Sequence, residues 1–180
     1  MIMIYFHGYG SDKTSRKYED CKRLFKNSSS FCVEWNPESD IKSILNVVDA
    51  ELSEQEQVIL IGDSTGANLA YQLREKRKEK GLKSILIMLS PLLDLDSRLN
   101  SKLIFSDNLR ESILKINNPE DAFIIVGKQD EVLDFVDLQD KITYNSEILF
   151  VEDSHRLPKF RDYLGYINHY VQRKLKYEYF

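Results

Sequence analysis

Short apolar runs alternate along this chain with longer stretches of helical periodicity, and this alternation restricts the fold more than any other feature. The predicted strands are six runs rich in isoleucine, valine and phenylalanine, at residues 2–6, 31–35, 58–61, 84–89, 122–126 and 147–151. The predicted helices cover residues 15–26, 39–52, 66–80, 133–143 and 157–176. This alternation favours βαβ units, so we expect an α/β fold with a six-stranded, mainly parallel sheet and helices on both faces.

The composition is that of one globular unit. A chain of 180 residues can bury one core, and we expect a single domain over residues 1–180. Hydrophobic residues make up 42% and charged residues 30% of the sequence, which is typical of a globular protein rather than a disordered or membrane-spanning one. The net charge of −4 does not favour a nucleic-acid partner, because binding one requires positive charge that neutralises phosphates.

Neither a targeting segment nor a metal site is indicated. The apolar run at residues 1–6 lacks the length and basic flank of a signal peptide, and no run approaches the roughly 20 residues of a membrane-spanning helix. We therefore expect a cytoplasmic protein with no membrane partner. Cys21 and Cys32 lack a CxxC spacing and nearby histidines, so we expect reduced structural cysteines, no metal and no cofactor. The sequence does not indicate the oligomeric state.

The strongest chemical signal is the motif GDSTG at residues 62–66, which follows the apolar run VILI and precedes the helical stretch ANLAYQLREK. A GxSxG motif between a strand and a helix presents its serine on a tight turn at the helix N-terminus. The same motif is also compatible with an ordinary tight turn capped by a serine. The strand and helix signals on either side favour Ser64 as a catalytic nucleophile.

A serine nucleophile needs a general base, and the chain has three histidines. His169 lies within the predicted C-terminal helix, and His7 precedes a glycine-rich turn after the first strand. His155 follows the last predicted strand, at the edge where parallel sheets build their sites, and it comes after the serine in chain order. We therefore predict that His155 is the base.

The base must be oriented by an acid, and the loop after the fifth predicted strand supplies Asp130 in the segment VGKQDEVLD. Asp153 is too close in sequence to His155 for an easy side-chain approach. The remaining alternatives are Glu131 and Asp134 in the same loop, and Asp94 and Asp96 after the fourth strand. The order Ser64, Asp130, His155 is the chain order of α/β hydrolases, which supports the assignment independently.

An oxyanion hole in such a site is built from two backbone N–H groups. The residue after the nucleophile, Thr65, supplies the first. For the second we predict the amide of Tyr9, with Gly10 as the alternative, because the segment HGYG follows the first strand. We expect His7 to support this loop by hydrogen bonding rather than to act in catalysis.

The chain resembles the small bacterial YqiA/YcfP-like esterases of the α/β-hydrolase superfamily. The matching segments span nearly the whole chain: YFHGYGSD, IGDSTGANLAYQL, GKQDEVLDF and FVEDSHRLPKFRDYLGYI. The resemblance implies a minimal α/β-hydrolase fold with little or no cap domain, the hydrolysis of carboxylic esters or thioesters, and catalytic roles for Ser64, Asp130 and His155. Asp63, Thr65 and residues 152–154 depart from the pattern, and these departures bear on the substrate.

The leading interpretation is therefore a serine hydrolase that forms an acyl-enzyme from a small acyl ester or thioester. An acyltransferase that uses the same acyl-enzyme is one alternative, and a non-catalytic binding protein of this fold is another, because the fold alone does not distinguish them. The segment at residues 91–119, where larger hydrolases insert a lid, is short, so we expect an open site that accepts short acyl chains.

Overall fold

The computed structural model describes residues 1–99, 104–135, 138 and 146–178. Its centre is a six-stranded sheet with the order β2-β1-β3-β4-β5-β6, in which every neighbouring pair of strands is parallel. The strands are β1 (Ile2–Phe6), β2 (Ser29–Val33), β3 (Val58–Asp63), β4 (Ile85–Leu89), β5 (Ala122–Gln129) and β6 (Glu147–Ser154). All the carboxyl ends of the strands therefore lie along one edge of the sheet, where α/β proteins place their sites.

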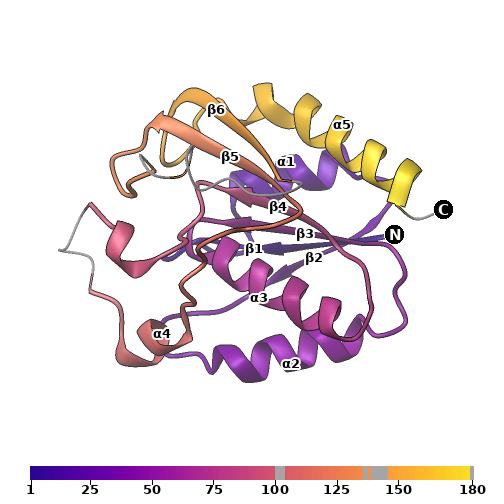
Figure 1. Cartoon of the computed structure of the whole chain (residues 1–180), viewed down its shortest axis with the longest axis horizontal. Coiled ribbons are helices and arrows are strands. Elements are labelled where there is room, and N and C mark those ends of the chain that lie inside the picture. Colours follow the sequence, from indigo (N-terminus) through magenta and orange to yellow (C-terminus); the bar gives the residue numbers. More distant parts are fainter. Residues whose placement is uncertain (100–103, 136–137, 139–145, 179–180) are drawn as a thin grey trace.

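Helices cover both faces of this sheet (Figure 1). On one face lie α1 (Arg16–Leu24) and α5 (Phe160–Glu178), and on the other lie α2 (Ile41–Glu51) and α3 (Thr65–Glu79). Successive strand residues point to opposite faces, so Met3 and Tyr5 pack with α1 and α5 while Ile4 and Phe6 pack with α2 and α3. Because both faces are buried, the central strands are apolar throughout, which is the continuous pattern of the sequence.

Most of the expected elements are present, with different limits. β2 begins two residues before the predicted strand at 31–35, and β5 and β6 each extend three residues beyond the apolar runs. α5 begins at Phe160, after a loop in which Leu157 has a positive φ of 48°. The added residues of β5 and β6 are a glycine and five polar residues, and Gln129 pairs with Ser154 after a register shift. These two strand ends lead into the loops that carry Asp130 and His155.

The helix predicted at residues 133–143 is wrong at its start. Leu133 pairs with Arg98 in an isolated antiparallel bridge, and the next two residues are not helical. Most of the remaining stretch lies outside the described residues. The segment at 91–119 contains a short 3-10 helix, η1 (Leu95–Ser97), and a short helix, α4 (Asp107–Ser112). Among the described helices, none has the length and apolar character needed to span a membrane.

Candidate active site

Ser64 lies at the sharp turn between β3 and α3, with φ 52° and ψ −116°. A non-glycine residue in this region is strained by roughly 1–3 kcal/mol and persists only where its surroundings hold it. Here the end of β4 holds it, because the Ser64 N–H donates to the Leu89 carbonyl at 2.8 Å and its carbonyl accepts from the Leu92 N–H at 3.0 Å. The turn therefore presents the hydroxyl at the carboxyl edge of the sheet.

The glycines of the motif allow the turn to pack closely. A Cβ on Gly62 would lie 2.3 Å from the Ala67 Cα, and one on Gly66 would lie 2.3 Å from the Phe6 carbonyl oxygen. Neither position could accept a side chain without moving backbone atoms. The GxSxG spacing thus reflects the contact of α3 with β1 and of β3 with the first turn of α3.

The structure brings together the three residues that the sequence predicted as a triad. The Ser64 Oγ lies 3.0 Å from His155 Nε2, and His155 Nδ1 lies 2.7 Å from Asp130 Oδ2. Both side chains beyond the serine are shielded from solvent, with exposed fractions of 12% for His155 and 2% for Asp130. Ser64, Asp130 and His155 come from the turns and loops after β3, β5 and β6, respectively. These segments meet at the carboxyl edge of the sheet.

The second oxygen of Asp130 fixes the direction of this carboxylate. Asp130 Oδ1 accepts the backbone N–H groups of Val132 at 2.9 Å and Leu133 at 2.8 Å. With Oδ2 facing Nδ1, the imidazole donates its Nδ1–H to the carboxylate and leaves Nε2 as the acceptor of the Ser64 hydroxyl proton. This is the tautomer that a general base requires.

The loop that carries Asp130 is itself attached to the segment after β4. The Leu99 N–H donates to the Val132 carbonyl at 2.8 Å, and the Asp134 N–H donates to the Ser97 carbonyl at 2.7 Å. These two hydrogen bonds flank the bridge between Arg98 and Leu133. The acid is therefore held by a short antiparallel pairing, where the sequence had indicated a helix.

The other carboxylates of the neighbourhood have different partners. Glu131 accepts the backbone N–H of His155 at 3.1 Å and does not contact the ring, and Asp94 pairs with Lys115 at 2.5 Å and caps η1. Asp94 raises the pKa of Lys115 through their hydrogen bond. Asp96 is 91% exposed. Of the acids considered from the sequence, Asp130 is the one hydrogen-bonded to the His155 ring in the described part of the chain.

Asp153 belongs to the start of α5 rather than to the triad. It is buried, and its Oδ2 accepts the Lys159 N–H and the Tyr163 hydroxyl, each at 3.0 Å. Burial and this carboxylate raise the pKa of Tyr163 to about 12. Asp153 thereby fixes the loop on which His155 stands.

The two amides predicted for the oxyanion hole belong to loops that touch. Within the described residues, neither the Tyr9 N–H nor the Thr65 N–H donates a hydrogen bond. The loop after β1 abuts the serine turn, because a Cβ on Gly8 would lie 3.4 Å from the Ser64 Cβ. The ring of Tyr9 stacks on Phe105 at 5.0 Å, and Gly10 has a positive φ of 70°. No hydrogen bond therefore occupies either amide in the described part of the chain.

The other two histidines have structural surroundings. His7 is buried, and its ring stacks on Trp35. Its Nδ1 donates to the Gly8 carbonyl at 2.9 Å, and its Nε2 accepts the backbone N–H of Trp35. It therefore supports the loop after β1, as the sequence suggested. His169 lies on the exposed side of α5.

Two residues at the N-terminus of α1 bind the segments that carry His155 and Ser64, and sequence reasoning missed both. Arg16 donates to the carbonyls of Pro158 at 2.7 Å and Leu157 at 2.8 Å, in the loop after His155. Lys17 pairs with Asp63 at 2.6 Å, with exposed fractions of only 8% and 13% for the two side chains. No local motif marks these residues, because their partners lie in other parts of the chain.

Neither cysteine takes part in the site, and both are free and buried. Burial raises the pKa of the Cys32 thiol to about 12 and also raises the pKa of Cys21. No cluster of three or more histidine, cysteine or acidic side chains suited to a metal ion occurs among the described residues.

Several solved structures share the fold of this chain. Solved structures with the same architecture include the type II thioesterase BorB from the borrelidin biosynthetic cluster, with a TM-score of 0.71 and 17% identity over 95% of this chain and 91% of that one. Mouse α/β hydrolase domain-containing protein 10 gives 0.70 and 15% over 97% and 89%, and Paleococcus ferrophilus monoacylglycerol lipase gives 0.66 and 12% over 94% and 93%. These similarities establish a minimal α/β-hydrolase fold.

No curated protein matches the sequence. A family model does match, over residues 2–172, and its description is Uncharacterised protein family UPF0227. This match confirms the resemblance to YqiA/YcfP-like proteins. The chain therefore belongs to family UPF0227.

Proposed function

We propose that this protein is a serine hydrolase that cleaves carboxylic esters or thioesters through an acyl-enzyme, with Ser64 as nucleophile, His155 as general base and Asp130 as the orienting acid. The observation that carries the proposal is the continuous hydrogen-bonded chain from Ser64 Oγ through the imidazole to a buried carboxylate. A serine that only capped a helix would need none of these partners, and Ser64 makes no side-chain cap hydrogen bond.

The reaction follows from the position of each group. His155 Nε2 removes the Ser64 hydroxyl proton as the oxygen attacks the substrate carbonyl, and the amides of Thr65 and Tyr9 stabilise the resulting oxyanion. The imidazolium then gives its proton to the departing alcohol or thiol, which leaves an acyl-enzyme. Water, deprotonated by the same nitrogen, attacks the acyl carbonyl. As the second oxyanion collapses, the imidazolium returns this proton to Ser64 Oγ, which releases the acid and restores the Ser64 hydroxyl.

A fluorophosphonate probe tests the nucleophile directly, because it labels only an activated serine. The wild-type protein should be labelled at Ser64 and should hydrolyse p-nitrophenyl acetate, and Ser64→Ala should lose both properties while keeping its circular dichroism spectrum. A wild-type protein that resists labelling would overturn the proposal in favour of a non-catalytic binding protein. Release of free acid in the absence of any acceptor distinguishes hydrolysis from acyl transfer.

Two further parts of the proposal concern the setting of the reaction. We propose one domain over residues 1–180. This is supported by the single sheet, which contains both the first strand of the chain, β1, and the last, β6. We also propose a cytoplasmic location, supported by two free cysteines, since reducing compartments keep thiols unpaired.

A further inference from the structure

Asn68 is a buried amide in the first turn of α3 that the proposed mechanism does not use. Its exposed fraction is 0%, and it follows Ser64 on the same helix start. Burying a side-chain amide is costly unless its donors and acceptors are paired. The partners of Asn68 therefore indicate what this position holds together.

The amide of Asn68 makes hydrogen bonds in all four directions. Its Nδ2 donates to the carbonyl of Leu92 at 2.9 Å and to that of Leu114 at 2.8 Å. Its Oδ1 accepts the Leu114 N–H at 3.1 Å and the Gln72 side-chain amide at 2.9 Å. A carboxamide has two N–H donors and one oxygen with two lone pairs, so these contacts use its full capacity. Asn68 thereby joins α3 to two points of the segment between β4 and β5.

The contact with Leu92 reaches back to the nucleophile. Leu92 accepts from Asn68 with its carbonyl and donates its own N–H to the Ser64 carbonyl at 3.0 Å. The strained backbone of Ser64 is held by this bond and by the one to Leu89. Leu89 is fixed by the sheet as the last residue of β4, whereas Leu92 lies in the loop beyond it. Asn68 supplies the support that the sheet does not give to Leu92.

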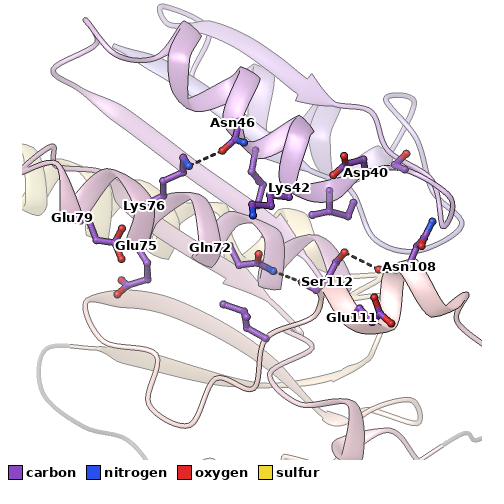
Figure 2. A pocket seen from close by; sticks show the side chains of 14 residues that line it. Asp40, Lys42, Asn46, Gln72, Glu75, Lys76, Glu79, Asn108, Glu111 and Ser112 are labelled. Carbon is purple, nitrogen blue, oxygen red and sulfur yellow. Dashed lines mark hydrogen bonds between the residues drawn. The ribbon is translucent and has the colours of Figure 1, made fainter.

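The contact with Leu114 attaches the end of α4 to the same helix. Both main-chain groups of Leu114 bond to Asn68, just after the last residue of α4, Ser112. One turn further along α3, the Gln72 side chain donates to the Ser112 carbonyl at 2.8 Å. Gln72 and Ser112 line a groove of about 720 Å³ between α2, α3 and α4, where Figure 2 shows them pointing toward one another. These bonds fix α4 against α3.

The start of α4 carries the ring that packs on the loop after β1. Phe105 is 4% exposed and stacks on the ring of Tyr9 at 5.0 Å. The next residue, Ser106, caps α4 and donates its hydroxyl to the Pro37 carbonyl. A shift of α4 would therefore move Phe105 and, with it, the loop that presents the Tyr9 N–H.

We propose that Asn68 is a positioning residue for the oxyanion hole, because its amide fixes both the Ser64 turn and, through α4, the Tyr9 loop. This inference rests on the proposed function, since it concerns the reaction of Ser64. Asn68 itself need not touch the substrate. Oxyanion donors stabilise the developing charge only while they are held in place, and a misplacement of about 1 Å can cost about 10²-fold in rate. An interaction made only in the transition state affects kcat and not KM.

The test is the measurement of kcat and KM for p-nitrophenyl acetate in Asn68→Ala and in a matched control, Gln72→Ala. The control removes the other amide of α3 that binds this segment and leaves the bond between Asn68 and Leu92. Asn68→Ala should lower kcat by about 10–100-fold with KM within about twofold, and Gln72→Ala should keep kcat within about threefold. Urea unfolding shows whether each variant is folded.

A second variant is available if Asn68→Ala does not fold. Asn68→Ser keeps a small polar group, and its hydroxyl can donate to only one of the two carbonyls that the amide joins. It should therefore show the same fall in kcat with KM unchanged.

A tetrahedral inhibitor gives a readout that a merely loosened protein would not produce. Phenylboronic acid adds to an activated serine and mimics the tetrahedral intermediate. Its inhibition constant in Asn68→Ala should rise by a factor similar to the fall in kcat, because transition-state analogues depend on the same donors as the reaction.

Three results would overturn the inference and leave the triad intact: kcat of a folded Asn68 variant within twofold of wild type, a rise in KM in place of a fall in kcat, or an equal loss in Gln72→Ala. A wild-type protein that is neither labelled by a fluorophosphonate nor active would instead overturn the proposed function, and this inference with it. Labelling of the wild type therefore distinguishes the two failures.

Discussion

Replacement of Asp130 by asparagine tests the proposed triad most sharply, because the surroundings of this side chain determine how the new amide must turn. In the native protein, Oδ1 accepts two backbone N–H groups, from Val132 and Leu133, and Oδ2 faces His155 Nδ1. An asparagine keeps both backbone bonds only if its oxygen takes the Oδ1 position. Its NH₂ group then faces Nδ1, which must become an acceptor.

This reversal of the donor moves the imidazole proton to Nε2, the nitrogen 3.0 Å from Ser64 Oγ. A protonated Nε2 cannot accept the serine proton, so the nucleophile loses its base while the geometry is retained. The same change of tautomer in a serine protease lowers kcat by about 10⁴-fold. At about 1.36 kcal/mol for each factor of ten, we expect a loss of about 5.4 kcal/mol of transition-state stabilisation.

The assay is kcat/KM for p-nitrophenyl acetate, measured beside urea unfolding to show that the variant is folded. Asp94→Asn and Asp134→Asn are the matched controls, since neither carboxylate contacts the His155 ring, and both should retain most of the activity. Activity of Asp130→Asn above about a tenth of wild type would refute the tautomer argument. A larger loss at Asp94 would assign the acid to the loop after β4.

Three other outcomes are expected. Gly66→Ala should lower the free energy of unfolding by roughly 1–3 kcal/mol in urea, because its Cβ would collide with a backbone oxygen of β1; an unchanged midpoint would contradict the packing. Cys21 and Cys32 should react with a thiol reagent at pH 8 only after unfolding, because burial raises both pKa values; rapid reaction of the native protein would contradict this. Among p-nitrophenyl esters, kcat/KM should peak at short acyl chains, since Phe105 already covers the ring of Tyr9; a steady rise towards palmitoyl would indicate a deep acyl tunnel.

The fold and the chemical residues could be predicted because each leaves a local signal in the sequence. Buried parallel strands are apolar throughout, and Ser64, Asp130 and His155 each follow one of them. The carboxyl ends of parallel strands share one edge, so residues far apart in sequence were expected to meet there. Chain order selected His155 among three histidines, and its ring does lie beside the serine.

The choice among neighbouring acids depended on contacts that the sequence does not display. Glu131 is adjacent to Asp130, yet it binds the backbone of His155 while Asp130 binds the ring. The difference comes from the pairing of Leu133 with Arg98, which turns the loop and brings two N–H groups onto Asp130. Helical periodicity after residue 132 indicated a helix there, and tertiary pairing overrode that local preference at Leu133.

The contribution of α1 is the part of the site furthest from any sequence signal. Its first two residues, Arg16 and Lys17, hold the loop after His155 and the residue before Ser64. Two side chains that follow one another along the chain thus constrain both ends of the bond between Nε2 and the serine hydroxyl. In the sequence they are only two basic residues at a predicted helix start, where the helix dipole favours acids. Their unfavourable position there is explained only by the carbonyls and the carboxylate that the sheet edge brings to them.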